Sequence, residues 1–318
     1  MRFLFFKISK KAQSLVELLV AVAVGVILIG GSATLIGVSL RSYNTIQKHL
    51  QANFLIRQEA EAIQALARND WHSVYGLNKQ NNYQISLSEN TWLISSGQET
   101  DIINNIPYKR YFQVYNVNRD GNGNIAETGT NDPNTQKITV FLEYGNNYIH
   151  SSAISFYLIR SINNQTFHQT DWSEGDGQTG PIPNPGNLFD TASNIDISVE
   201  GQITMATTTS DSTLVSSILD SGVVGGAGFN SLLWQGAFNS GGSVKFQIAF
   251  SNSAAGPWTY YGLTSIEDWY QPNPNVSISF PLAGSASPQN NRYLRYKVQL
   301  STSGTSPRID DIIINWNP

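Results

Sequence analysis

One set of oxygen-bearing side chains has the spacing of a calcium-binding loop. Asn118, Asp120 and Asn122, followed by Gly123, match the first, third, fifth and sixth positions of an EF-hand loop. The twelfth position is Gly129, so the bidentate carboxylate that completes such a loop is missing. Asp-Gly and Asn-Gly steps also favour a tight hairpin. The sequence leaves a structural calcium site open and favours a plain hairpin turn.

Aromatic side chains gather in the last third of the chain. Trp258, Trp269 and Tyr270 lie near prolines, as loop residues do. Such rings suit glycan binding, because a ring face packs on a sugar while nearby Asn and Asp side chains bind its hydroxyls. The competing interpretation is that most of these rings belong to a hydrophobic core, and both interpretations remain open.

No pattern of side chains indicates an enzyme. The four histidines are scattered, and neither H-E-x-x-H, G-x-S-x-G nor a P-loop occurs. The G-x-G-x-x-G match at residues 175–180 is followed by prolines instead of the helix that a dinucleotide site needs. With no cysteine, the chain has neither a thiol nucleophile nor a disulfide. We predict no catalytic residue and no cofactor apart from the calcium ion considered above.

The charge balance argues against a nucleic-acid partner. Only 13% of the residues are charged, and the net charge is −4. Residues 187–318 contain more acidic than basic side chains. Nucleic-acid binding gains affinity from phosphate neutralisation by clustered Lys and Arg, so no nucleic acid is expected.

A single acidic residue stands at the start of an apolar segment near the N-terminus. Glu17 precedes residues 18–40, which carry no charge and form, as a helix of about 35 Å, a segment able to cross a bilayer. The basic residues concentrate before this segment, so we expect the N-terminus inside and the rest of the chain outside a single crossing. A carboxylate in such a setting is costly and indicates a function that supplies a cationic partner.

Residues 10–20, with the sequence KKAQSLVELLV, resemble the processing site of type IV prepilins and pseudopilins. The resemblance implies that prepilin peptidase cuts between Ala12 and Gln13, that the new amine of Gln13 is methylated, and that Glu17 is the fifth mature residue. The family usually has Gly before the cut and often Phe or Met after it, where this chain has Ala12 and Gln13. Pairing of the Gln13 ammonium group with Glu17 of a neighbouring subunit would then set the axial stagger of a filament.

A cleaved secretory signal is the alternative explanation of the N-terminus. Residues 20–29 would be its apolar core and Gly31-Ser32-Ala33 its cleavage site. The apolar segment is longer than such a core and begins with an acid, and both features favour processing at Ala12 instead.

Helical periodicity continues past the apolar segment. Apolar residues recur at spacings of three and four, which predicts one helix over residues 14–68 with an amphipathic outer half. The positions of this single predicted stripe are Tyr43, Ile46, Leu50, Phe54, Ile56, Ala60, Ile63 and Ala67. The period then changes to two in residues 71–168, which predicts an antiparallel sheet packed on the helix. Its hairpin at 119–125 and the Asp132–Thr135 segment before the next strand resemble the head domain of minor pilins.

The pattern of residues in the rest of the chain predicts a second, all-β unit. Residues 169–186 are rich in Gly and Pro and predict a linker. Short alternating strands follow in residues 187–318, as in a β-sandwich or jelly roll. Leu294, Tyr296, Val298 and Leu300 are expected on its inner face. The segments 219–222, 233–234, 244–247, 293–296 and 309–312 resemble galactose-binding-like sandwich modules of bacterial surface proteins.

The sequence therefore predicts an α+β chain in five parts. These are a leader (1–12), a transmembrane and stem helix (13–68), a pilin-like β head (69–168), a linker (169–186) and a separate jelly-roll-like β-sandwich (187–318). The predicted function is a minor pilin or pseudopilin of a type IV pilus-like or type II secretion-like filament, in which the helix binds other pilin subunits and the sandwich binds surface glycans. The alternative is a membrane-anchored or secreted carbohydrate-binding protein that never joins a filament.

Overall fold

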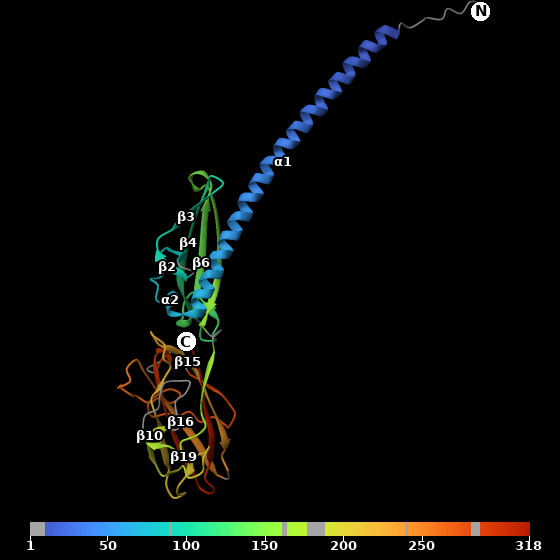
Figure 1. Cartoon of the computed structure of the whole chain (residues 1–318). Coiled ribbons are helices and arrows are strands. Elements are labelled where there is room, and N and C mark those ends of the chain that lie inside the picture. The colour runs from blue at the N-terminus through green and yellow to red at the C-terminus, as the bar shows by residue number, and fades with distance from the viewer. Residues whose placement is uncertain (1–9, 89–90, 161–163, 177–187, 240, 281–286) are drawn as a thin grey trace, which may run out of the picture.

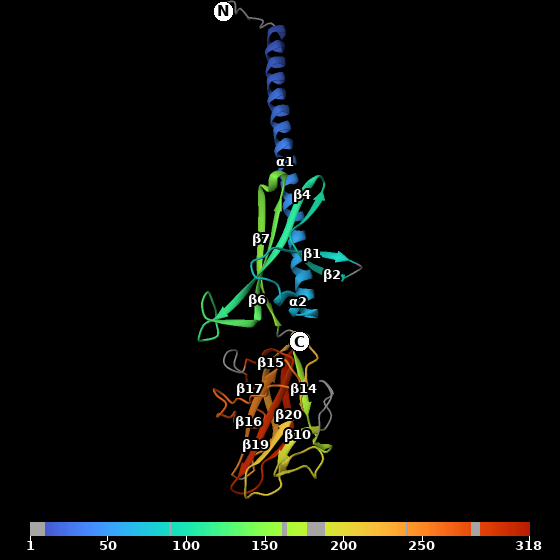
Figure 2. The same ribbon diagram turned by 90° about the vertical axis from the view of Figure 1, so that its left-hand side faces the viewer.

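The structure combines one long helix with mostly antiparallel β-sheets, which confirms the predicted α+β class. It is a computed structural model that describes residues 10–88, 91–160, 164–176, 188–239, 241–280 and 287–318. Most of the predicted leader and the greater part of the predicted linker, residues 1–9 and 177–187, lie outside the described residues. The helix, the head and the sandwich follow one another along the molecule (Figures 1 and 2).

Helix α1 (Lys10–Asn69) is unbroken over 60 residues. It is long and apolar enough to cross a membrane or to serve as a signal, and its most apolar stretch is 0% buried within the molecule. Figure 1 shows this N-terminal half projecting well beyond the head. From Ala52 onward the helix packs on the head sheet, and small buried residues such as Ala60 and Ala67 allow a close approach.

The predicted single stripe divides into a buried row and an exposed row. Ile56, Ala60, Ile63 and Ala67 are buried against the sheet, as expected. Tyr43, Ile46, Leu50 and Phe54, here called the outer row, are instead 56–63% exposed. At 100° per residue the outer row is centred roughly 115° around the helix from these four buried residues. The prediction that the two halves form one stripe is therefore wrong.

The head is a seven-stranded antiparallel sheet covered on one face by α1. Its strand order is β2-β1-β4-β6-β7, and β3 and β5 also pair with β4. A short helix, α2 (His72–Tyr75), and a 3-10 turn, η1 (Asn146–Tyr148), complete it. The strands are β1 (Tyr83–Ser88), β2 (Thr91–Ser96), β3 (Glu99–Ile103), β4 (Ile106–Arg119), β5 (Ile125–Ala126), β6 (Thr130–Tyr144) and β7 (His150–Ile159).

The second unit packs a six-stranded sheet against a five-stranded sheet. The first has the order β14-β19-β13-β10-β9 with β16 also on β19, and the second the order β17-β15-β20-β8 with β18 also on β15. The strands of the six-stranded sheet are β9 (Gly175–Asp176), β10 (Leu188–Ser193), β13 (Ser212–Ser216), β14 (Leu219–Asp220), β16 (Gly242–Ser251) and β19 (Tyr293–Thr302). Those of the other sheet are β8 (Gln165–Gln169), β15 (Ala227–Ala237), β17 (Ile278–Ser279), β18 (Gln289–Asn291) and β20 (Arg308–Asn317), and β11 (Ile195–Asp196) pairs with β12 (Thr204–Met205).

Inner side chains of the two sheets form one core. Leu294, Tyr296, Val298 and Leu300 of β19 are 0% exposed, which confirms their predicted inward orientation. Outward residues alternate with them along the strand, as the period of two requires. The arrangement of two facing sheets supports the predicted β-sandwich architecture.

The boundary between the units differs from the prediction. Residues 165–168, assigned to the head, and Gln169, assigned to the linker, form β8, which pairs antiparallel with β20 in the sandwich. Trp172, assigned to the linker, is 1% exposed in the sandwich core and donates its indole N–H to Tyr296 at 3.1 Å. The sandwich therefore begins before residue 169, because the first strand of this unit completes the sheet of its last strand.

Head and sandwich meet through a buried arginine at the end of β7. Arg160 donates from Nε to the Pro318 carbonyl (2.8 Å) and from its terminal nitrogens to Asn290 Oδ1 (3.0 Å) and the Gly226 carbonyl (2.5 Å). His72 Nε2 lies 2.7 Å from the same Gly226 carbonyl. Burial lowers the pKa of Arg160 to about 10 and also lowers the pKa of His72, so the contact favours a neutral imidazole beside a charged guanidinium.

Candidate interaction sites

The residues predicted for processing and assembly lie near the start of α1. The backbones of Ala12 and Gln13 are helical, and Glu17 follows one turn later with an exposed side chain. Glu17 is the only charged residue between Leu15 and Leu40. The structure thus sets Glu17 in an apolar helical surface that nothing within the described residues covers.

A buried carboxylate lies where α1 packs on the head sheet, well beyond the apolar segment. Glu59 is 3% exposed, and neither of its carboxylate oxygens has a hydrogen-bond partner among the described residues. Its Oε2 is 3.9 Å from Nε of Arg110, whose Nη2 is 2.5 Å from Glu99 and 3.3 Å from Asp101. Three carboxylates therefore share one guanidinium. Burial raises the pKa of Glu59 to about 7, although Arg110 opposes the shift.

Glu59→Gln should stabilise the head at alkaline pH. The pKa of Glu59 rises from 4.5 to about 7 on folding, so the folded state binds the proton more tightly than the unfolded state. Proton binding by Glu59 therefore stabilises the folded state fully below pH 4.5, and this stabilisation is lost as the pH rises to about 7. Removing the charge should raise the free energy of unfolding at pH 8 by about 1–3 kcal/mol and leave it nearly unchanged at pH 4.5.

Thermal unfolding of the full chain in lipid nanodiscs at both pH values measures this difference. Glu61→Gln, an exposed neighbour on the same helix, is the matched control and should change neither value. A Glu59→Gln protein less stable than wild type at pH 8 would mean that attraction to Arg110 outweighs the cost of burying the charge.

The predicted calcium loop is a hydrogen-bonded hairpin. The Oδ1 atom of Asp120 accepts from the backbone N–H groups of Asn122 (2.9 Å) and Asn124 (2.8 Å), and the amide of Asn118 donates to the Glu127 carbonyl (3.1 Å). The hydrogen bonds that the Asp120 carboxylate accepts, chiefly from the Asn124 backbone, lower the pKa of Asp120. No cluster of three His, Cys, Asp or Glu side chains suited to a metal occurs in the described part of the chain. The geometry therefore matches the plain turn that the sequence favours.

Two of the three predicted glycan-binding aromatics lie over the outer face of β19. The ring of Trp258 lies 5.2 Å from the guanidinium carbon of Arg295, and that of Trp269 lies 5.3 Å from Nζ of Lys297. Arg295 is itself paired with Asp190 at 2.9 Å. Since Arg295 and Lys297 are alternate residues of one strand, both rings lie on the same face. Both tryptophans are half-buried.

Tyr270 belongs to the core instead. It is 5% exposed, and its backbone exchanges hydrogen bonds with Phe246 of β16. It therefore lacks the free ring face that stacking on a sugar requires. Trp234 is also fully buried and donates its N–H to the Pro272 carbonyl at 2.9 Å. For these two rings the core interpretation holds.

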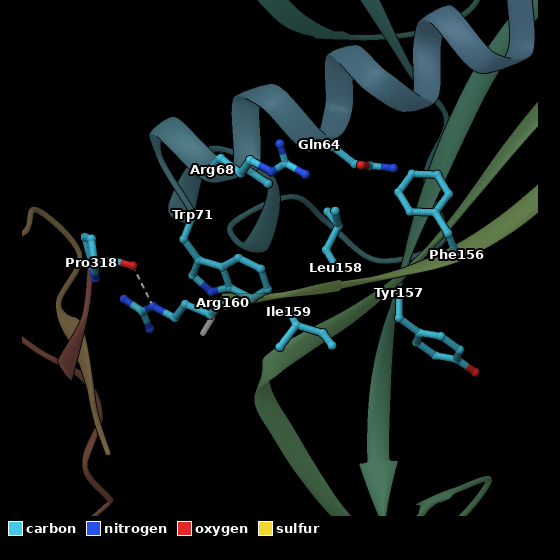
Figure 3. A pocket seen from close by; sticks show the side chains of 10 residues that line it. Gln64, Arg68, Trp71, Phe156, Tyr157, Leu158, Ile159, Arg160 and Pro318 are labelled. Atoms are coloured by element: carbon cyan, nitrogen blue, oxygen red, sulfur yellow. Dashed lines mark hydrogen bonds between the residues drawn. The ribbon is translucent and has the colours of Figure 1, made fainter. Parts of the chain in front are cut away.

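A cavity of about 130 Å³ opens beside the junction of head and sandwich. Figure 3 shows Arg68 of α1 and the adjoining Trp71 on one side, and β7 on the other. Phe156 and Leu158 of β7 point toward the helix, whereas Tyr157 and Ile159 point away from it (Figure 3). Most of the wall is apolar, and none of the described residues that line it is acidic.

Sequence reasoning identified neither Arg160, Glu59 nor this cavity. Arg160 contacts Gly226 and Pro318, which are far away in the sequence, and Glu59 meets Arg110 only after α1 packs on β4. The available signal was a charged residue at a position expected to be apolar: Glu59 lies within the buried face of α1, and Arg160 follows the apolar end of β7.

Comparison with known proteins gives little similarity. No protein-family model matches the chain, and no curated protein matches it. One similar solved structure is described as "Structural basis for the promiscuous specificity of the carbohydrate-binding modules from the beta-sandwich super family". The sequence identity is 14% and the TM-score is 0.22. The match covers 76% of this chain and 98% of the solved chain. A superposition this loose supports no inference about fold or ligand.

Proposed function

We propose that this protein is a minor pilin or pseudopilin that enters a type IV pilus-like or type II secretion-like filament through α1 and carries its β-sandwich outside the cell. The outer row of α1 carries this proposal. A helix that only anchors a protein needs apolar side chains within the bilayer, which residues 18–40 supply. Tyr43, Ile46, Leu50 and Phe54 extend the exposed apolar surface beyond that segment.

An exposed apolar row on a helix outside the bilayer requires a packing partner. Contiguous exposed apolar surface marks interaction sites, because burying it stabilises association by about 25 cal/mol per Å². A helix with one apolar row buried on its own head and a second apolar row exposed is suited to pack against neighbouring helices as well. Packing of stem helices side by side, as in the filaments of the resembled family, satisfies this need.

Glu17 adds specificity to that packing. Cleavage between Ala12 and Gln13 would create an ammonium group four residues before Glu17. The carboxylate of one subunit and the ammonium group of the next would then neutralise one another in an apolar setting, where neither is stable alone. Prepilin peptidase and the membrane are the partners of this step, and methylation would follow at Gln13.

The mature chain should begin at Gln13. Mass spectrometry of the N-terminal peptide, from protein made in cells that contain a prepilin peptidase, should find Gln13 with an added methyl group. Cells that lack the peptidase are the control and should retain Ala12. A mature terminus at Thr34, after the Gly31-Ser32-Ala33 site, would remove the first part of α1 and refute the filament proposal.

The second candidate function, a carbohydrate-binding surface protein that is not assembled, is favoured by the pair of tryptophans over β19. Trp258→Ala and Trp269→Ala should each weaken binding of the full chain to a glycan array by about tenfold, which corresponds to 1.4 kcal/mol. Tyr157→Ala, an exposed ring on the head, is the matched control.

Cooperative unfolding of each variant should match that of wild type. Unfolding of the tryptophan variants, or a blank array with wild type, would instead identify these rings as packing residues over Arg295 and Lys297.

A further inference from the structure

Strand β7 forms a free edge of the head sheet. Among the described residues it pairs only with β6, through a continuous register from His150 to Ile159 without a bulge. These ten residues contain no Lys, Arg, Asp, Glu or Pro. Natural edge strands are usually protected from pairing by charges, prolines, bulges or a covering element. Within the part of the chain that the structure describes, the absence of these devices from β7 indicates an edge that is built to pair.

Apolar side chains lie exposed along this edge. Tyr157 is 47% exposed and Ile159 46% exposed on the face away from α1, and Ile149, just before the strand, is 72% exposed. An open edge with such side chains is an aggregation hazard when nothing covers it. Strand addition by a partner would satisfy the backbone groups and cover the apolar surface in one step.

The cavity lies where an added strand would place a side chain. It is a groove between Ala67 and Arg68 of α1 and the free edge of β7 at Phe156 and Leu158. Side chains of an added strand that face the helix would extend the row of Phe156 and Leu158 into this groove. At about 130 Å³ it has room for an apolar group, since a buried cavity of about 150 Å³ holds benzene.

The charge of the groove restricts the partner further. Arg68 and Arg160 belong to its lining, and no Asp or Glu does so among the described residues. The nitrogens of Arg160 already donate to Pro318, Asn290 and Gly226, so Arg160 contributes its charge to the groove and not a free donor. A partner segment that carries an acidic residue beside its apolar residue complements this charge. A second copy pairing through the same edge would run antiparallel about a two-fold axis and would turn its stem helix away from the membrane in which the first is anchored.

We propose that β7 and the adjoining groove bind an extended segment of a different polypeptide, which adds to the head sheet and inserts a bulky apolar side chain flanked by an acidic residue. The inference does not depend on filament assembly, because it concerns the edge of the head alone. The partner's backbone supplies the affinity, and the groove selects the side chain.

Synthetic hexapeptides test this proposal with the full chain in lipid nanodiscs. An array of the form Thr-Val-Thr-X-Thr-Z would vary the apolar residue X among Phe, Leu, Ile and Ala, and the flanking residue Z among Asp, Ser and Lys. We expect binding to be strongest with a bulky X and Asp at Z. Hydrogen exchange should slow at the amides of β7. N-methylation of alternate peptide nitrogens, which blocks strand pairing but keeps the side chains, should weaken binding at least about tenfold.

Two variants separate the groove from the edge. Ala67→Leu fills the groove and should abolish the preference for a bulky X while retaining slowed exchange in β7. Ala153→Lys, an exposed edge residue, should abolish binding of every peptide. Absence of binding across the array, equal binding of the N-methylated peptide, or slowed exchange outside β7 would each overturn the proposal.

Discussion

Glu17→Ala should eliminate the protein from sheared filaments while leaving its amount in the membrane unchanged or increased. Insertion gains from removal of a charge, which costs about 2.5–3.5 kcal/mol at the centre of a spanning helix. Assembly loses the carboxylate that would neutralise the Gln13 ammonium group of a neighbour. The measurement is the ratio of protein in the sheared fraction to protein in the membrane fraction, at equal expression.

The outer row gives an independent variant for the same measurement. Phe54→Asn removes an apolar group that is 61% exposed, so it should reduce incorporation without destabilising the head. Asn53→Gln, an exposed polar neighbour, should behave as wild type. Normal incorporation of both Glu17→Ala and Phe54→Asn would leave α1 with an anchoring role only.

A fragment of residues 187–318 should fail to fold, whereas residues 164–318 should unfold cooperatively. The shorter fragment lacks β8 and with it Phe167, and it also lacks Trp172; both side chains are 1% exposed in the core. Loss of one such aromatic side chain costs about 3–5 kcal/mol, and the total stability of a domain is about 5–15 kcal/mol. Near-ultraviolet circular dichroism and thermal unfolding of the two fragments provide the comparison.

Equal unfolding temperatures for the two fragments would contradict the assignment of β8 to the sandwich. A third fragment, residues 164–318 with Trp172→Phe, separates the contribution of the strand from that of the indole. It should retain the fold with lower stability, because the ring still fills the core while the hydrogen bond to Tyr296 is lost.

Local periodicity accounts for the parts of the fold that the sequence predicted. The apolar segment and the spacing of three and four define α1, and the alternation in residues 293–300 gives the inner face of β19 correctly. These patterns arise from single elements. The predicted boundary at residue 169 was wrong because β8 belongs to the sandwich through its pairing with β20, at the other end of the unit. The Gly- and Pro-rich residues 175–186 follow Trp172, which already lies in the sandwich core, so their composition did not mark the border between the units.

The candidate sites differ in the same way: some depend on one segment of the sequence, and others depend on how distant segments pack together. Glu17 is recognisable from a single acid in an apolar helix, a property of one segment. The outer row has the apolar composition of a stripe. Whether it is buried or exposed depends on which side of the helix the sheet covers, and the spacing of residues along the helix does not specify that side. Tyr270 and Trp258 lie in similar proline-flanked contexts, and only the packing of β16 separates the buried ring from the half-buried one.

The way in which the sandwich is joined to the head determines how the molecule would carry tension. The chain passes between the two units once, from Arg160 into β8, so a pull on the far end of the sandwich is resisted there. β8 begins at the junction and runs into the sandwich antiparallel to β20, with Gln165 opposite Trp316. Tension along the molecule would slide β8 past β20 and strain all five of its residue pairs together, instead of opening them one after another. Pairing along the whole of this strand would therefore resist separation of the sandwich from the head.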